Sequence, residues 1–149
     1  MWETVVDSLF PDLDIADIGE VELAESVVSA NKWTYVIDYR KRRTVLDDAG
    51  YPKKTTTYEE YLVQTALKIL NTERFRYVVY GDEVGVERTE WFWWEDVEIK
   101  RDIEEALMAH AEIQRAEVRS MQRAGQEMLL NISLSGLAGI AELEEGIST

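Results

Sequence analysis

The sequence predicts an α+β fold, in which a small, mostly antiparallel sheet is flanked by two main helices and preceded by an acidic N-terminal arm. Two stretches, residues 58–71 and 95–110, repeat apolar side chains with the spacing of a helix. Several shorter stretches alternate with the period of two that marks strands. At 149 residues the chain is most simply one domain over residues 31–149, with residues 1–30 as an arm or extension.

The first thirty residues carry eight Asp or Glu side chains and no Lys or Arg. Large apolar residues such as Trp2, Leu9 and Phe10 recur among them, and a disordered acidic tail would hold fewer. Two interpretations stay open. The segment is either an arm that packs along a neighbouring subunit, or a short helix and loop packed on the chain's own domain.

Residues 33–39 alternate between two faces, which predicts a strand. The basic run Arg40-Lys41-Arg42-Arg43 follows, and Thr44-Val45-Leu46 is expected to return as a short strand. Beside an acidic N-terminus, the basic run is expected to pair within the protein or at a subunit contact. A solvated hairpin turn is the alternative.

The helix over residues 58–71 is predicted to begin after the capping residue Thr57 and to stop at Asn71. After Thr72-Glu73-Arg74 the apolar period changes to two. Residues 75–80 are therefore predicted as an aromatic strand, which Gly81-Asp82-Glu83 ends.

Residues 91–94, Trp-Phe-Trp-Trp, are the densest aromatic stretch. Consecutive aromatic side chains cannot all face one core, and Trp is enriched at protein contacts. One of Trp91, Trp93 or Trp94 is therefore expected on a partner surface. The alternative is burial on both sides, between sheet and helix.

The second helix, over residues 95–110, has an apolar side and a charged side. The apolar side comprises Val97, Ile103, Ala106 and Leu107, with Ile99 at its edge. The charged side, expected to face solvent, comprises Glu98, Arg101, Asp102 and Glu105. The only histidine, His110, stands near the helix C-terminus, where a cation complements the helix dipole.

Residues 112–145 are predicted to form two or three strands, with turns near Gly125 and Gly136 and a tail from Glu144. Within residues 126–134, the side chains of Leu130, Ile132 and Leu134 share one face. This segment contains no Pro, Lys or Arg, so it is expected to be an unprotected sheet edge with a built-in partner.

The net charge of −14 argues against a nucleic-acid partner, because phosphates require clustered Lys and Arg. No apolar run reaches the roughly 20 residues that span a bilayer, and the first ten residues lack the basic start of a signal peptide. We therefore expect a protein made in the cytoplasm, without a membrane partner. An acidic balance keeps a subunit soluble and also suits a basic partner surface.

Motifs for catalysis, metals and cofactors are missing from the sequence. It has no phosphate-binding loop, no cysteine, and no Ser-His pair or metal cluster with motif spacing. Nothing singles out a pair of carboxylates for glycoside hydrolysis. The sequence therefore predicts no enzyme, no cofactor, no metal site and no small-molecule substrate.

A helix followed by Leu70-Asn71-Thr72-Glu73-Arg74-Phe75-Arg76-Tyr77, then Tyr80 and Gly85-Val86-Glu87, resembles the small baseplate proteins of contractile phage tails. The pattern is most similar to those of PBSX-like prophages. More distantly, it is similar to the sheath initiators of larger phages and of type VI secretion. The resemblance covers residues 33–113.

The resemblance implies a structural virion protein at the top of the tail baseplate, around the tail tube, that nucleates sheath assembly. The implied mechanism is β-strand sharing, in which an arm of a sheath subunit adds to an open sheet edge. The implied partners are the tail sheath protein, baseplate wedge subunits, and tail tube or hub proteins.

The resemblance also implies contact residues. The corner Thr72-Glu73-Arg74 and the segment with Tyr80, Gly85 and Glu87 recur in this family and would contact a neighbouring wedge or tube subunit, or else pair locally. A Glu-Pro-Arg signature of distant members reads His110-Ala111-Glu112 here. The expected partner-binding residues are Thr72, Glu73, Arg74, Tyr80, Gly85, Glu87, Trp91, Trp93, Trp94, Leu130, Ile132 and Leu134.

A second function stays open on the same sequence. An acidic adaptor that binds and regulates a basic protein would have the same charge balance, and the fold alone would not separate it from a baseplate protein.

Overall fold

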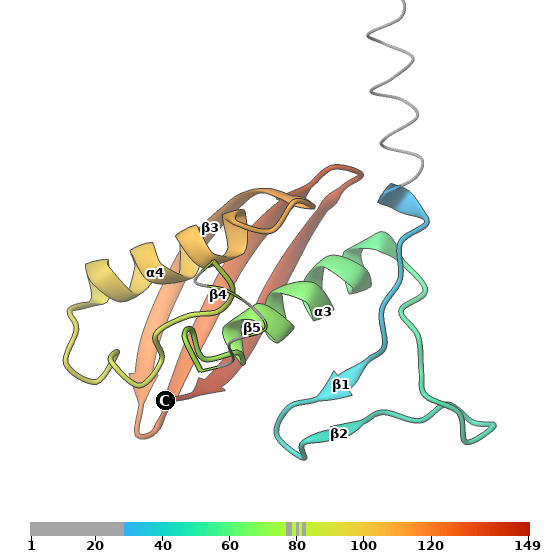
Figure 1. Cartoon of the computed structure of the whole chain (residues 1–149), viewed down its shortest axis with the longest axis horizontal. Coiled ribbons are helices and arrows are strands. Elements are labelled where there is room, and N and C mark those ends of the chain that lie inside the picture. Colours follow the sequence, from blue (N-terminus) through green and yellow to red (C-terminus); the bar gives the residue numbers. More distant parts are fainter. Residues whose placement is uncertain (1–28, 77–78, 80, 82) are drawn as a thin grey trace, which may run out of the picture.

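A three-stranded antiparallel sheet, two helices and a small hairpin make up the described chain (Figure 1). The computed structural model describes residues 29–149 except 77, 78, 80 and 82. In chain order the elements are β1 (Ile37–Asp38), β2 (Arg43–Thr44), α3 (Tyr58–Leu70), α4 (Asp96–Met108), β3 (Ile113–Ala124), β4 (Glu127–Gly136) and β5 (Ile140–Ser148). The predicted α+β class is confirmed. The prediction of an arm over residues 1–30 falls almost wholly outside the described residues.

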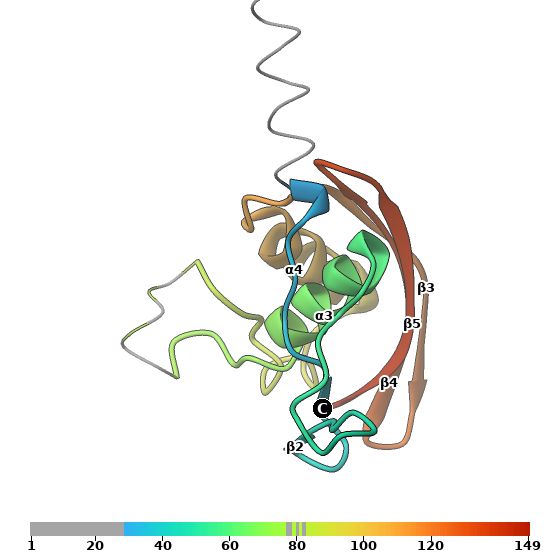
Figure 2. The ribbon, with the colours of Figure 1, turned by 90° about the vertical axis from the view of Figure 1, so that its right-hand side faces the viewer.

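Both helices cover the same face of the curved sheet, as Figure 2 shows. α4 packs on β3 and α3 packs on β5, while β4 runs between the two outer strands. The covered face is apolar because every second residue of each strand points inward. Leu130, Ile132 and Leu134 of β4 are buried there, with Val118 of β3 and Leu143 of β5 on either side of Ile132.

The two helices begin and end close to the predicted positions. The Thr57 hydroxyl accepts a hydrogen bond from the Glu60 amide, 3.2 Å away, and caps α3. α4 begins after Glu95, whose side chain forms a reciprocal capping box with Glu98. These local bonds satisfy amides that the first turn of a helix leaves free, which explains why the sequence fixes both starts.

The predicted sides of the second helix need two corrections. Val97 is 77% exposed rather than buried, because it lies two residues before Ile99 and therefore on nearly the opposite side of α4. Asp102 is buried rather than solvated, because it lies three residues after Ile99 and so flanks the buried stripe.

The prediction that residues 126–134 form a sheet edge is wrong. These residues lie mostly in β4, which pairs with β3 on one side and β5 on the other. A lack of Pro, Lys and Arg suits a central strand as well as an open edge, since both need unbroken backbone pairing. The last strand also reaches Ser148, so the predicted tail from Glu144 is part of the sheet.

Two other predicted strands are short or missing. The strand over residues 33–39 reduces to β1 and a single bridge between Tyr35 and Lys54. The described residues of the predicted strand 75–80 contain no strand, and Phe75 has a φ of 64°. A left-handed residue turns the chain instead of extending it. A short return strand is present as β2, but it begins inside the basic run, at Arg43, and shares only Thr44 with the predicted residues 44–46.

Candidate functional site

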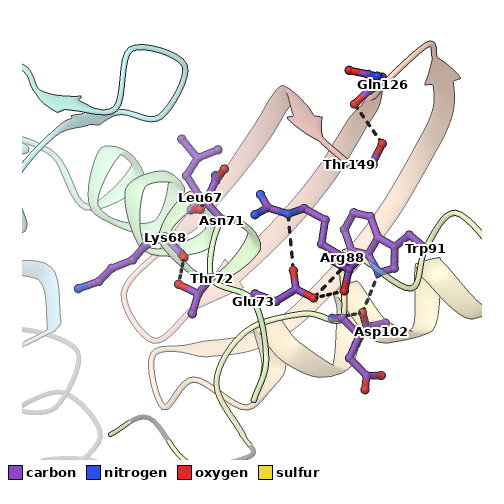
Figure 3. Close-up of polar contacts among 12 residues, drawn as sticks. Leu67, Lys68, Asn71, Thr72, Glu73, Arg88, Trp91, Asp102, Gln126 and Thr149 are labelled. Carbon is purple, nitrogen blue, oxygen red and sulfur yellow. Dashed lines mark hydrogen bonds and ion pairs between the residues drawn. The ribbon is translucent and has the colours of Figure 1, made fainter. Parts of the chain in front are cut away.

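A polar corner joins the end of α3, the loop before α4 and α4 itself. Its centre is Asp102, which is only 5% exposed. One carboxylate oxygen, Oδ1, lies 3.0 Å from a guanidinium nitrogen of Arg74. The other, Oδ2, accepts hydrogen bonds from the Glu87 amide at 3.0 Å and from Trp91 Nε1 at 2.8 Å (Figure 3). This arrangement compensates a buried carboxylate with one cation and two further donors.

Backbone contacts bring the corner segments together even more closely. The amide of Val86 donates to the carbonyl of Thr72 at 3.1 Å, and the amide of Arg74 donates back to Val86 at 2.9 Å. Gly85 has a φ of +94°, and a Cβ there would lie 2.4 Å from the Thr72 carbonyl oxygen. Only glycine fits this backbone and this approach, so residues 72–74 and 85–87, which are among those that carry the resemblance, form one local structure.

Glu73 is held in the same region. Its Oε1 accepts from the amide and the hydroxyl of Thr89, at 3.2 and 2.8 Å, and its Oε2 lies 3.8 Å from Arg88 Nε (Figure 3). Glu73 and Arg74 therefore pair locally, which is the alternative that the sequence left open. Both side chains keep little exposed surface, so any direct contact with a subunit stays a prediction.

The four aromatic residues after the corner divide between core and surface. Trp91 is buried beside Asp102, and Trp94 packs partly buried against the core. Phe92 and Trp93 are 73% and 79% exposed, with their rings edge to face at 4.9 Å. Of the three tryptophans considered, Trp93 is thus the one available to a partner. Tyr80, another predicted contact, lies outside the described residues.

The predicted contact residues of β4 are not at the surface. Leu130, Ile132 and Leu134 are at most 3% exposed and face the helices. Their alternation identified the core face of the sheet, not a partner site, and sequence alone could not say which strand would be the outermost one.

β5 is the open edge of the sheet. The Thr149 amide donates to the Gln126 carbonyl, and the Gly136 amide donates to the Gly139 carbonyl, both at 2.8 Å. Because backbone groups alternate in direction along an antiparallel strand, odd-numbered residues of β5 bond to β4. The amides and carbonyls of Ile140, Glu142 and Glu144 therefore point outward. No hydrogen bond from the described part of the chain reaches them.

The other edge, β3, is better covered. The Val118 amide donates to Glu104 Oε1 of α4 at 3.1 Å, and Arg123 bonds to the Trp94 carbonyl at 2.6 Å. Glu104 of α4 and the backbone of the loop before α4 thus cover part of this strand. Among the described residues, β5 is the less covered of the two outer strands.

A second buried carboxylate ties the start of the described chain to the sheet. Glu112 is 2% exposed, and its Oε1 accepts from Ser29 Oγ at 3.1 Å and from Lys32 Nζ. Its Oε2 accepts from the Tyr58 hydroxyl at 2.9 Å. Burial opposes ionisation of Glu112, but these donors outweigh it and hold the pKa of its carboxyl below the usual range. Burial and the bond to Glu112 raise the pKa of Tyr58 to about 12.

His110 does not have the role of a helix-end cation that its position suggests. Burial lowers the pKa of its imidazole, and its Nδ1 accepts a hydrogen bond from the Glu112 amide at 3.2 Å. An accepting nitrogen carries no proton, so the ring is neutral here. The position of His110 between a predicted helix and a predicted strand did not indicate that its imidazole would be partly buried.

The described residues contain no group of three or more His, Cys, Asp or Glu side chains arranged to hold a metal ion. In the same part of the chain, no helix is long and apolar enough to cross a membrane. No model of a known protein family matches the chain, and no curated protein sequence matches it significantly.

Proposed function

We propose that this chain is a structural protein of a contractile tail baseplate, which surrounds the tail tube and nucleates the sheath by sharing a β-strand. The observation that carries the proposal is the outer edge of β5, whose backbone groups at Ile140, Glu142 and Glu144 have no partner among the described residues. An extended arm of a tail sheath subunit pairs there as a fourth strand. The resemblance over residues 33–113 supplies the identity of that arm.

The polar corner supports the same proposal as a positioning device. Asp102 of α4 fixes Arg74, which follows α3, and Glu87 and Trp91 of the loop before α4. Phe92 and Trp93 follow directly as an exposed aromatic pair. We assign Trp93 to a contact with a wedge, tube or hub subunit, since exposed Trp beside a rigid support is typical of interfaces. The corner residues then act by holding this pair, not by touching the partner.

The proposal is tested by replacing one outward-facing amide of β5. Glu144→Pro removes an N–H that points away from β4, so β4 and β5 keep their backbone hydrogen bonds while an added strand loses a donor and meets the proline ring. Within the sheet it removes one side-chain contact, the 3.4 Å bond from Asn131 Nδ2 to Glu144 Oε1. The matched control, Glu144→Gln, keeps the amide and changes only the charge. Each purified protein is mixed with the sheath protein of the same tail, and ring formation is counted by electron microscopy.

We expect the wild-type chain and Glu144→Gln to seed sheath rings, and Glu144→Pro to seed at least tenfold fewer. Circular dichroism and the melting temperature confirm that the proline variant is folded. Normal ring formation by a folded Glu144→Pro protein would overturn strand sharing at β5.

An acidic adaptor that regulates a basic protein is the second candidate function. The net charge of −14 and the exposed Glu142 and Glu144 favour it. Such an adaptor would bind its partner through charge alone, so Glu144→Gln and Glu144→Pro, which remove the same charge, would weaken binding equally. Strand sharing instead predicts a much larger loss for Glu144→Pro than for Glu144→Gln. The same pair of variants therefore separates the two functions.

A further inference from the structure

A groove beside the open edge of β5 consists of two hollows that share no lining residue. The first, about 560 Å³, lies between Val36, Val63 of α3 and Ala141 of β5. The second, about 320 Å³, lies nearer the end of the strand, between Tyr39, Leu67 of α3 and Ile147 of β5. Residues of α3 line both hollows, and the segment around β1 stands opposite the strand edge. A strand added along residues 140–145 of β5 would place side chains of one face in the first hollow.

The two faces of such a strand would meet different chemistry. On the helix side, Val36, Val63 and Ala141 give the first hollow an aliphatic part, beside polar side chains such as Glu60 and Gln64. On the outer side, Glu142 and Glu144 are exposed, and each alternates with an inward-facing residue. Cross-strand neighbours on one face interact directly, so opposite charges are favoured on the outer face and aliphatic side chains on the inner face.

We propose that the segment bound at β5 is an extended stretch of a partner protein in which Lys or Arg alternates with aliphatic residues. Its basic side chains lie on the outer face against Glu142 and Glu144, and its aliphatic side chains enter the groove over α3. This inference rests on the proposed strand sharing and adds the sequence chemistry of the donor strand.

Charge excludes a second copy of this chain as the occupant. If two β5 strands paired edge to edge, their outer faces would set Glu142 and Glu144 of one copy against the same residues of the other. Like charges opposite one another in a sheet are destabilising. The glutamates therefore protect the free edge from self-association and at the same time select a basic strand.

Arg40 sets the limit of the available edge. Its guanidinium lies 4.0 Å from Glu127 Oε2. The same group passes over Gly146, where a Cβ would lie 3.3 Å from Nη2. This side chain borders both the groove and the hollow on the outer face, so it crosses the strand edge. The donor strand pairs along residues 140–145 and ends before Arg40.

The test uses three synthetic peptides and the full chain labelled with ¹⁵N. The first peptide, Thr-Val-Arg-Val-Lys-Val-Thr, has the proposed alternation. In the second, Thr-Val-Glu-Val-Glu-Val-Thr, the charge is reversed. The third, Val-Arg-Lys-Thr-Val-Val-Thr, has the composition of the first without its alternation. Amide shifts map the binding site, and a titration gives each Kd.

We expect the first peptide to shift the amides of residues 140–145 and to bind at least tenfold more tightly than the other two. The double variant Glu142→Gln, Glu144→Gln should weaken it by about tenfold, as two lost cross-strand charge pairs would. Raising the salt concentration should also weaken it, because exposed charges are screened.

Two different failures can be told apart. If the charge-reversed or shuffled peptide binds at β5 as tightly as the first, the proposed donor chemistry is wrong while strand sharing stands. If β5 binds none of the peptides and Glu144→Pro still seeds sheath rings, strand sharing itself is wrong.

Discussion

A single buried residue, Asp102, holds the polar corner together. Asp102 contacts a cation that follows α3, and an indole N–H and a backbone amide from the loop before α4. The resemblance drew attention to Arg74, Gly85 and Glu87. Arg74 and Glu87 both contact this carboxylate, and Arg74 Nε donates to the Gly85 carbonyl at 3.1 Å. Removing the carboxylate would leave Arg74 partly buried without its counter-ion, and breaking a buried pair costs more than the pair itself contributes.

We expect Asp102→Ala to lower the free energy of unfolding by about 3–5 kcal/mol, the usual loss when one partner of a buried ion pair is removed. Asp102→Asn keeps one acceptor and should cost less. Glu105→Gln is the matched control on the same helix, because its pair with Arg101 is exposed and contributes less than about 1 kcal/mol. Urea unfolding of the three variants gives the comparison, and equal losses for Asp102→Ala and Glu105→Gln would refute it.

The position of a side chain could be predicted from the sequence where it depends on neighbouring residues in the chain. The cap at Thr57 and the burial of Ile103, Ala106 and Leu107 follow from spacing alone, and both are present. The burial of Asp102 could not be predicted from the sequence, because Arg74 and Trp91 come close to it only when the chain folds. The left-handed Phe75 was missed for the same reason, because an aromatic residue gives no sequence sign of a positive φ.

At the level of elements, Glu112 links the segment before β1, the start of α3 and the start of β3. Its donors Ser29, Lys32 and Tyr58 come from parts of the chain that are distant in sequence. The Glu112 carboxylate therefore connects these elements, and its ionisation should affect the free energy of unfolding.

The pKa of Glu112 lies below its ordinary value of 4.5 in the folded chain. Its contribution to stability is therefore present above pH 4.5 and is lost as the pH falls through the lower, folded pKa. The lowered pKa of His110 acts in the same direction, because below its ordinary value of 6.5 protons bind the unfolded chain more readily. Acid should destabilise the fold for both reasons.

We expect Glu112→Gln to lower the free energy of unfolding at pH 7 by about 1–3 kcal/mol, the range for hydrogen bonds to a charged group. Its stability should also fall less than that of the wild type between pH 5 and pH 3. Urea unfolding at several pH values measures both effects. An unchanged acid dependence in the variant would show that Glu112 is not the titrating group.

The strands of the sheet could be predicted from the sequence, but their order in the sheet could not. Period-two alternation predicted strands after residue 112, and the helices were predicted within two residues at each end. Which strand lies outermost is a property of the pairing, and β4 and β5 have similar patterns in isolation. The open edge was therefore expected in the wrong strand, although the expectation that one exists agrees with β5.

On the scale of the whole molecule, the described helices cover one face of the sheet, and no described residue pairs with the outer edge of β5. Such an edge invites self-association unless charge prevents it. The outer face of β5 carries Glu142 and Glu144, and the chain has a net charge of −14, so repulsion between copies is strong.

We expect the double variant Glu142→Val, Glu144→Val to form dimers or larger species at concentrations where the wild type is monomeric. Valine favours strand pairing, and the repulsion across a shared edge would be gone. Glu90→Val with Glu105→Val makes the same charge change at exposed positions of the loop before α4 and of α4, and should stay monomeric. Sedimentation velocity compares them, and a monomeric β5 variant would mean that charge is not what protects the edge.

The shared carboxylate of Asp102 has a geometric consequence for any assembly built on this chain. It fastens the base of the aromatic pair to α4, and α4 packs on the same sheet that ends in β5. The interval between the exposed indole of Trp93 and the strand edge is therefore set by the hydrophobic core. Two neighbours docked on these two places would be held at a constant separation, as by a rigid spacer.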